Sequence, residues 1–128
     1  MDRDAMVEVA RRAIARQDEH DTESILELFA ADVRFMMPVL DRPLEGRDAL
    51  RQSIEQSWPE SSTAIEWTAV DGDRLVCCWS WRGKGADWPE DSPPLRGVST
   101  FVFDEDGLVS DYEDRFDPDW MSRHAGSA

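Results

Sequence analysis

The sequence predicts an α+β domain in which three N-terminal helices pack on one face of a curved antiparallel sheet. Two patterns support this fold class. Apolar residues recur at helical spacing before Pro59, whereas after it they alternate with polar residues, as in strands that are buried on one face. The length of 128 residues corresponds to one domain, and a hydrophobic fraction of 41% can form its core. We therefore predict a single domain over residues 1–128 whose tail, 119–128, is flexible.

Three helices are predicted before the alternating region. The first runs from Asp2 to about Gln17 and has an apolar face made of Met6, Val9, Ala10, Ala13, Ile14 and Gln17. Asp21 is a suitable N-cap for the second helix, which carries Ile25, Leu26, Leu28 and Phe29 and ends at residues 30–32. The third helix begins at residues 47–48, ends at Pro59, and presents on one side Leu50, Ile54, Ser57 and Trp58.

One short strand and four long strands are predicted. The short strand, residues 33–37, lies between the second and third helices and is stopped by Pro38. Alternation predicts strands at 65–70 and 75–82, joined by a turn, and a further strand at 96–103 after an irregular loop at 83–94. An acidic turn closed by Gly107 leads into the last strand, 110–118, so the four long strands follow one another in antiparallel order.

Charge and composition disfavour several classes of partner. A formal net charge of -14 at pH 7 disfavours nucleic acid and anionic membrane surfaces, because both carry negative charge. No apolar run approaches the roughly 20 residues of a membrane-spanning helix, and the N-terminus lacks the apolar core of a signal peptide, so we expect a cytoplasmic protein. Cys77 and Cys78 are predicted to be two buried thiols, and no His/Cys cluster has metal-ligand spacing.

The last strand carries the residue on which the functional argument depends. Because side chains alternate along a strand, Tyr112, Asp114 and Phe116 share one face, which places a carboxylate between two aromatic rings. Burial in apolar surroundings raises the pKa of a carboxyl group towards neutrality, where a general acid or base works best. We predict Asp114 as the catalytic acid/base, with Tyr112 donating a hydrogen bond to a substrate oxygen. The alternative is a structural salt bridge from Asp114 to an arginine, for which the candidates are Arg82, Arg96 and Arg115.

Aromatic and apolar residues on the inner face of the sheet are predicted to enclose a substrate pocket around Asp114. The residues expected to bind the substrate are Phe35, Met37, Trp58, Trp67, Trp79, Trp81, Ser99, Phe101 and Phe116. The alternative is that these side chains only fill a core. The sequence has no nucleophile elbow, phosphate-binding Gly-rich loop or dinucleotide motif, so we expect a reaction that needs no cofactor.

Several motifs resemble one known family. The segment at residues 29–35, followed by Pro38 and by Gly46-Arg47-Asp48-Ala49, is similar to the SnoaL-like branch of the nuclear transport factor 2 superfamily, and so is the ending at residues 106–117. The resemblance covers nearly the whole chain. It implies a cone-shaped α+β barrel with a deep apolar pocket, commonly a homodimer through the sheet. The family includes polyketide cyclases, limonene-epoxide hydrolases, ketosteroid isomerases and dehydratases.

The resemblance also implies roles for single residues. Asp114 matches the acid on the final strand that serves cyclases and epoxide hydrolases as the acid/base group. Epoxide hydrolases also need an Arg-x-Asp pair, where this chain has Trp79-Ser80-Trp81, and the base of ketosteroid isomerase falls on Met37. The resemblance therefore favours a cyclase-like or related acid/base role. Because one lone acid can relay a proton but cannot easily both activate water and protonate a leaving group, we expect cyclase, isomerase or lyase chemistry on a small apolar substrate. Three alternatives stay open: a non-catalytic module that binds a small apolar molecule, an epoxide hydrolase with a non-standard acid set, and a dimerisation domain with a vestigial pocket.

Overall fold

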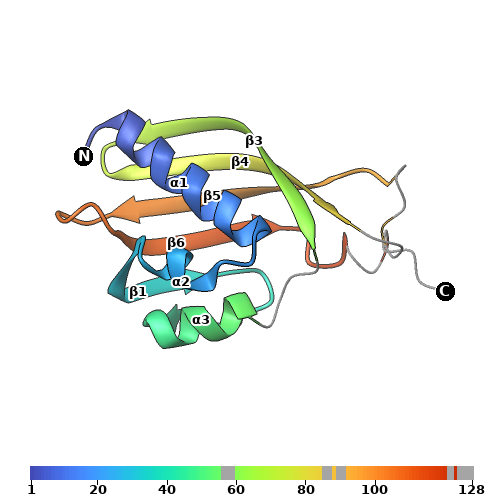
Figure 1. Ribbon diagram of the computed structural model, residues 1–128, viewed down its shortest axis with the longest axis horizontal. Helices are drawn as coiled ribbons and strands as arrows, with labels where there is room; N and C mark the ends of the chain where they lie inside the picture. Colours follow the sequence, from blue (N-terminus) through green and yellow to red (C-terminus); the bar gives the residue numbers. More distant parts are fainter. Residues whose placement is uncertain (56–59, 85–87, 89–91, 121–122, 124–128) are drawn as a thin grey trace.

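The computed structural model describes residues 1–55, 60–84, 88, 92–120 and 123 and confirms the predicted α+β plan (Figure 1). Helices lie against one face of a curved six-stranded sheet. The helices of the described residues are α1 (Arg3–Asp18), α2 (Thr22–Leu26) and α3 (Arg47–Glu55). The strands are β1 (Phe29–Met36), β2 (Leu44–Glu45), β3 (Ser61–Asp71), β4 (Arg74–Gly83), β5 (Leu95–Phe103) and β6 (Val109–Phe116).

The sheet is mixed and not antiparallel throughout. Its order is β2-β1-β6-β5-β4-β3, and every neighbouring pair is antiparallel except β1 and β6, which run parallel. Four antiparallel strands in succession, as predicted, are therefore found in β3 to β6, and the parallel pairing of β1 with β6 makes the sheet mixed. Parallel neighbours need a long crossover connection, and here α3 and the strands from β3 to β5 supply it. As a result, β6 lies in the interior of the sheet.

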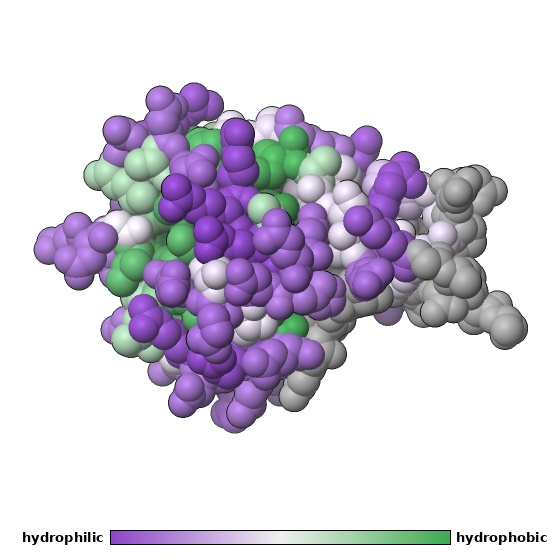
Figure 2. All heavy atoms as spheres, in the orientation of Figure 1, coloured by the Kyte–Doolittle hydropathy of each residue, from purple (hydrophilic) through white to green (hydrophobic). Residues whose placement is uncertain are grey.

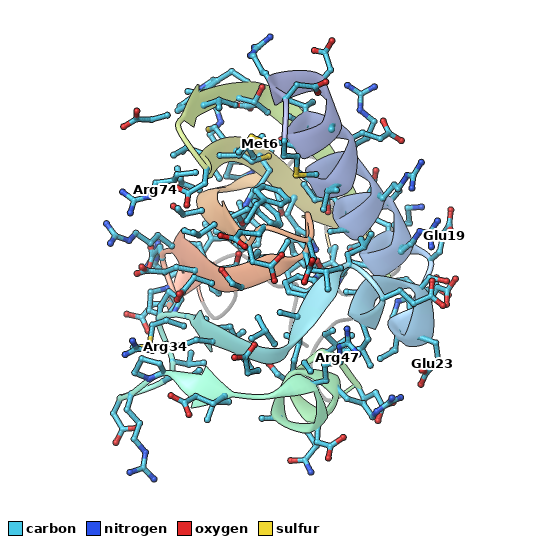
Figure 3. All side chains as sticks on the ribbon, turned by 90° about the vertical axis from the view of Figure 1, so that its left-hand side faces the viewer. Met6, Glu19, Glu23, Arg34, Arg47 and Arg74 are labelled. Carbon is cyan, nitrogen blue, oxygen red and sulfur yellow. The ribbon has the colours of Figure 1, made fainter. Side chains whose placement is uncertain are left out.

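The first helix crosses the inner face of the sheet. Met6, Ala10 and Ala13 are at most 8% exposed, and Met6 points from α1 towards the strands (Figure 3). The Asp2 carboxylate caps the helix by accepting the Ala5 N–H at 2.8 Å. The predicted apolar face of α1 is thus the face that meets the core.

The surface over the helices is largely hydrophilic, with small apolar areas between charged side chains (Figure 2). On α1 an ion pair of 3.1 Å joins Glu8 and Arg12, one helical turn apart. Both side chains are about half exposed, so the pair adds little stability. Within the described residues, no helix combines the length and apolar character required to cross a membrane.

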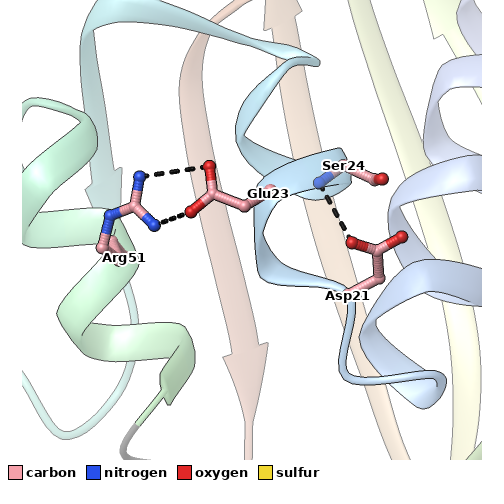
Figure 4. A network of polar contacts seen from close by, with 4 residues as sticks. All are labelled: Asp21, Glu23, Ser24 and Arg51. Carbon is pink, nitrogen blue, oxygen red and sulfur yellow. Dashed lines mark hydrogen bonds and ion pairs between the residues drawn. The ribbon is translucent and has the colours of Figure 1, made fainter.

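The second helix is shorter than predicted, because the chain changes from helix to strand earlier. Asp21 caps α2 as predicted, and its carboxylate accepts the Ser24 N–H at 3.3 Å (Figure 4). The helix ends at Leu26, however, and β1 begins at Phe29, not at residue 33. Phe29 pairs with Val109 of β6, so pairing with a distant strand overrides the helical spacing of this segment.

The third helix begins at Arg47, as predicted, and two arginines join it to its neighbours. The Arg47 guanidinium donates to the Phe29 carbonyl oxygen, with Nε at 2.9 Å, and so holds the start of β1. Arg51 forms an ion pair with Glu23 of α2 (Figure 4). The predicted continuation of this helix to Trp58 lies outside the described residues.

A bulge in β3 turns Trp67 away from the core. The register with β4 shifts between Ile65, which pairs with Trp79, and Trp67, which pairs with Cys78. Glu66 and Trp67 consequently both face outwards, and Trp67 is 51% exposed. The prediction that Trp67 lines the pocket is wrong, because it assumed unbroken alternation along the strand.

The two adjacent cysteines occupy opposite faces of β4. Cys77 is fully buried, and burial raises the pKa of its thiol to about 11. Cys78 is half-buried on the outer face, with its sulfur 3.8 Å from the Glu66 carboxylate. Both are free thiols. The prediction of two buried thiols is therefore right for Cys77 and wrong for Cys78.

The described part of the C-terminal segment packs on the domain through Trp120, and the flexibility predicted for the tail stays a prediction. Trp120 is 7% exposed. Its ring stacks on Trp88, with centroids 6.0 Å apart, and meets the Trp81 ring edge-on at 6.2 Å. Beyond Trp120 the structure describes only Arg123, so the rest of the tail lies outside the described residues.

Candidate functional site

Asp114 lies on the inner face of β6, as the alternation of the strand predicts. It pairs across the sheet with Ser99 of β5, and Tyr112 pairs with Phe101. The Tyr112 ring packs edge-on against Phe29 and Phe101, with centroid distances of 5.7 and 5.0 Å. These contacts hold the Tyr112 hydroxyl beside the Asp114 carboxyl group.

A chain of hydrogen bonds leads to Asp114, and the chemistry of its members sets the direction of each bond. The Trp79 Nε1–H can only donate, and it donates to Ser99 Oγ at 2.8 Å. Ser99 then uses its one hydroxyl proton to donate to Asp114 Oδ1 at 2.5 Å. Tyr112 Oη lies 3.5 Å from Ser99 Oγ, and the Tyr112 hydroxyl donates to Asp114. Two hydroxyl groups therefore stabilise the ionised form of Asp114.

The pKa of Asp114 results from burial acting against these hydrogen bonds. Burial raises the pKa from 3.8 to about 6, because the carboxylate loses hydration, while the hydrogen bonds from Ser99 and Tyr112 lower it. Burial also raises the pKa of Tyr112 well above 10, and the charge of Asp114 adds to this effect. At neutral pH, Asp114 is thus mostly ionised yet able to take up a proton, whereas Tyr112 stays a neutral donor.

No arginine among the described residues pairs with Asp114. Arg96 and Arg115 form ion pairs with glutamates, at 3.4 and 3.0 Å, and Arg82 donates to a backbone carbonyl oxygen at 2.8 Å. The alternative of a structural salt bridge at Asp114 is therefore wrong for the part of the chain that the structure describes.

Trp79 reaches Ser99 because the residue opposite it has no side chain. Gly97 is the cross-strand partner of Trp79, and a Cβ at Gly97 would lie 2.3 Å from the indole ring. The ring therefore lies across the backbone of β5, close to the next inward residue, Ser99. Phe116 packs beside the ring, with centroids 6.2 Å apart.

Two cavities meet at Asp114. Ile14, Gln17, Tyr112 and Asp114 line both of them. The cavities leave about 30 and 50 Å³ for the centre of a water-sized molecule. Apart from Asp114, the described lining residues are uncharged, and no group of three or more His, Cys, Asp or Glu side chains in the described part of the chain could hold a metal ion. A ligand in either cavity would meet one carboxylate in otherwise uncharged walls.

Most of the predicted site residues come together at these cavities. Trp79, Trp81, Ser99 and Phe116 line the first cavity, Phe35, Met37 and Phe101 line the second, and Tyr112 and Asp114 line both. Trp67 faces outwards, and Trp58 lies outside the described residues. The roles of these residues in binding or catalysis stay predictions.

Gln17 is a further residue of the site, and helical spacing alone does not single it out. The spacing places it on the apolar face of α1 with Ile14, and both residues line both cavities. A carboxamide on an otherwise apolar helical face is nevertheless a signal, because a polar group there needs a hydrogen-bond partner, water or a ligand.

Comparison with known proteins identifies the family and the fold. The profile of the SnoaL-like domain family matches residues 10–112 of the chain. No curated protein matches the sequence. At identities below 20% the structural similarities that follow establish the fold alone.

Three solved structures illustrate the similarity. SalBIII, an epoxide hydrolase/cyclase-like enzyme in pyran ring formation in the polyether salinomycin, has a TM-score of 0.76 and 17% identity, covering 91% of this chain and 94% of that chain. A protein from Shewanella putrefaciens CN-32, provisionally named a SnoaL-like polyketide cyclase, has a TM-score of 0.76 and 19% identity, covering 93% and 84%. A computationally designed 17-OHP binder has a TM-score of 0.73 and 16% identity, covering 91% and 95%.

Proposed function

The chain belongs to the SnoaL-like domain family, and on this basis we propose that it is a cofactor-independent acid/base enzyme acting on a small, largely apolar substrate. The observation that supports this most directly is Asp114, a carboxyl group with a pKa of about 6 in cavities with otherwise uncharged walls. Burial of the ionised carboxylate opposes folding, and an apolar residue would fill the same place without that penalty. A role in chemistry accounts for the carboxylate better than a role in stability does.

In this proposal Asp114 moves a proton between two atoms of the substrate. At pH 7 most of Asp114 is ionised, since its pKa is about 6, so the carboxylate can take a proton. The carboxylic acid that results can return the proton to another atom. The hydroxyl protons of Ser99 and Tyr112 are directed at Asp114, so we assign both residues to positioning the carboxylate.

The number of acid/base groups favours certain reactions. Among the described lining residues of the two cavities, only Asp114 and Tyr112 can titrate, and Tyr112 stays neutral. One carboxyl group can relay a proton, but it cannot easily both activate water and protonate a leaving group. We therefore favour isomerisation, cyclisation or elimination over hydrolysis. The cyclase names of SalBIII and of the Shewanella protein agree with cyclisation.

Hydrogen–deuterium exchange on a carbon acid tests the proposed proton transfer. The assay follows 2-cyclohexen-1-one in D2O by proton NMR, with wild type, Asp114→Asn and a matched control, Asp32→Asn, at an exposed position of β1. Wild type and the control should speed up exchange with a pH midpoint near 6, because the ionised form of Asp114 is the base. Asp114→Asn should exchange at the background rate while unfolding as cooperatively as wild type. Equal exchange in wild type and Asp114→Asn would refute the role of Asp114.

Binding without catalysis is the second candidate function. The small cavities with largely uncharged walls support it, and the designed 17-OHP binder is a ligand-binding protein of the same fold. A binding module should take up an apolar ligand with the same affinity in wild type and Asp114→Asn, and neither should speed up exchange. Catalysed exchange by wild type would exclude this alternative.

We further propose that two copies associate through the outer face of the sheet. A groove of about 720 Å³ on this face is lined by Val76, Val98 and Val102, by Thr100, and by charged residues that include Arg74, Asp111, Glu113 and Arg115. Charges of both signs beside apolar side chains suit a self-complementary contact between identical chains. Light scattering should give a dimer for wild type and a monomer for Val98→Asp. A monomeric wild type at micromolar concentration would contradict the proposal.

We also propose a cytoplasmic location. Cys77 and Cys78 are both free thiols, which suits a reducing compartment. Cell fractionation with an antibody against the chain would test this, and recovery of the protein from the culture medium would contradict it.

A further inference from the structure

Gln17 lies at the junction of three hollows in the structure. Two of them are the cavities at Asp114, and the third is a surface crevice of about 200 Å³ between the end of α1 and α3. Ile54 is shared by the crevice and the second cavity. Gln17 and Ile54 therefore lie where the crevice adjoins the second cavity, which Asp114 also lines.

Within the described residues the Gln17 carboxamide forms no hydrogen bond, and because no fully buried polar side-chain atom there lacks a partner, the carboxamide is accessible. A carboxamide has two N–H donors and a carbonyl acceptor, and all of them are available here. Tyr112, the other neutral donor that lines both cavities, directs its proton at Asp114. Among the described residues that line both cavities, Gln17 is therefore the one whose N–H donors can bind a ligand.

The last turn of α1 is fixed to the sheet by the residue next to Gln17. The Asp18 carboxylate accepts hydrogen bonds from the Thr63 N–H at 2.8 Å, the Thr63 hydroxyl at 2.9 Å and the Ser61 hydroxyl at 3.3 Å. The Gln17 carbonyl oxygen in turn accepts the N–H of His20, which closes the helix. Because both ends of this turn are held, Gln17 keeps its place beside the cavities that contain Asp114.

From this geometry we propose that Gln17 binds the carbonyl oxygen of the substrate while Asp114 exchanges a proton with a neighbouring carbon, an inference that rests on the proposed acid/base function. When Asp114 takes the proton, the electrons of the C–H bond form a C=C bond, and the electrons of the C=O bond move onto oxygen. The Gln17 N–H donors face the negative charge that develops there. Return of the proton from Asp114 to the same or a conjugated carbon restores the C=O bond, so no other reactant is needed.

The charges of the site point to a neutral substrate. Neither cavity has an Arg, Lys or His among its described lining residues, and the ionised Asp114 repels carboxylates and phosphates. A carboxamide, in contrast, offers donors without a charge, which suits the oxygen of a neutral carbonyl group. The proposed substrate class is therefore a small ketone or enone with an apolar body.

Binding and proton transfer can be measured separately. Binding is followed by NMR titration with two probes of similar size, 2-cyclohexen-1-one and cyclohexene, which lacks the carbonyl oxygen. Gln17→Met keeps the length of the side chain without its donors, and Gln52→Met on the exposed side of α3 is the control. Wild type and the control should prefer the enone by roughly three- to tenfold, and Gln17→Met should bind both probes alike. Absence of the preference in wild type, or its persistence in Gln17→Met, would overturn the proposal.

The exchange assay in D2O separates this inference from the proposed function. Gln17→Met should slow exchange of 2-cyclohexen-1-one by roughly 100-fold, while the pH midpoint stays near 6 because Asp114 is unchanged. An exchange rate equal to that of wild type would overturn the role of Gln17. If instead Asp114→Asn exchanges as fast as wild type, the acid/base function fails, and a carbonyl preference that depends on Gln17 would then support Gln17 as a residue of a binding module.

Discussion

Replacement of Ser99 by Ala should raise the pKa of Asp114, although it removes no charge from the site. Ser99 Oγ donates to Asp114 Oδ1 at 2.5 Å, and this bond stabilises the ionised form of the carboxyl group. A hydrogen bond to a charged group contributes about 1.5–3 kcal/mol, and one pKa unit corresponds to about 1.4 kcal/mol. The pKa of Asp114 should therefore rise from about 6 by about one unit or more.

A carbon-detected NMR titration of the aspartate carboxyl groups measures this pKa directly. Asp114→Asn assigns the signal, and Ser80→Ala, on the outer face of β4, is the matched control that should leave the pKa near 6. A pKa of Asp114 that stays near 6 or falls in Ser99→Ala would refute the direction deduced for the hydrogen bond.

Ser99→Ala also leaves the Trp79 Nε1–H without its acceptor, which should cost about 1–3 kcal/mol of stability. The double variant Ser99→Ala with Trp79→Phe removes donor and acceptor together, so part of this loss should be recovered. If the single variant does not fold, the double variant serves for the same titration. Its Asp114 pKa should also lie above that of wild type, because the hydroxyl is missing in both variants.

Three further outcomes are expected. Folding raises the pKa of Asp114 from 3.8 to about 6, so ionisation of Asp114 opposes folding. In urea titrations the free energy of unfolding of wild type should fall by up to about 3 kcal/mol relative to that of Asp114→Asn as the pH rises from about 4 through 6. A difference between the two proteins that does not vary with pH would contradict this. Gly97→Ala places a Cβ 2.3 Å from the Trp79 ring, so we expect the free energy of unfolding to fall by about 1–3 kcal/mol and the NMR resonance of the indole N–H to shift. An unchanged resonance would show that the ring does not need the close approach to Gly97. His20 has φ 59°, a left-handed conformation that favours glycine, so His20→Gly should raise stability by about 1 kcal/mol, and a lowered melting temperature would speak against this source of strain.

The inward position of Asp114 could be predicted because β5 and β6 pair without interruption around it. From Gly97 opposite Phe116 to Val102 opposite Asp111 the register is regular, so a count of alternate residues places each side chain on the correct face. Trp67 could not be placed in this way. The bulge before it adds one residue to β3, and no change in the local composition signals that insertion.

Contacts between distant segments explain the other differences between the predicted and the observed structure. Residues near Phe29 suit a helix or a strand, and only pairing with Val109 decides for the strand. In the same way, helical spacing predicts that Gln17 lies on the inner face of α1, but it does not predict that Gln17 and Asp114 line the same cavity. Trp120 lies in a largely polar tail, and its burial depends on the rings of Trp81 and Trp88, which are far away in sequence.

The interior position of β6 has a consequence for the synthesis of the protein. β6 is the most C-terminal strand of the sheet, yet it lies between β1 and β5, so the two parts of the sheet cannot join until residues 109–116 have left the ribosome. That segment also carries Asp114. A nascent chain that stops before residue 109 therefore has neither a closed sheet nor the acid, and its unpaired strand edges are open to aggregation. Translation thus completes the scaffold and the reactive group in the same step.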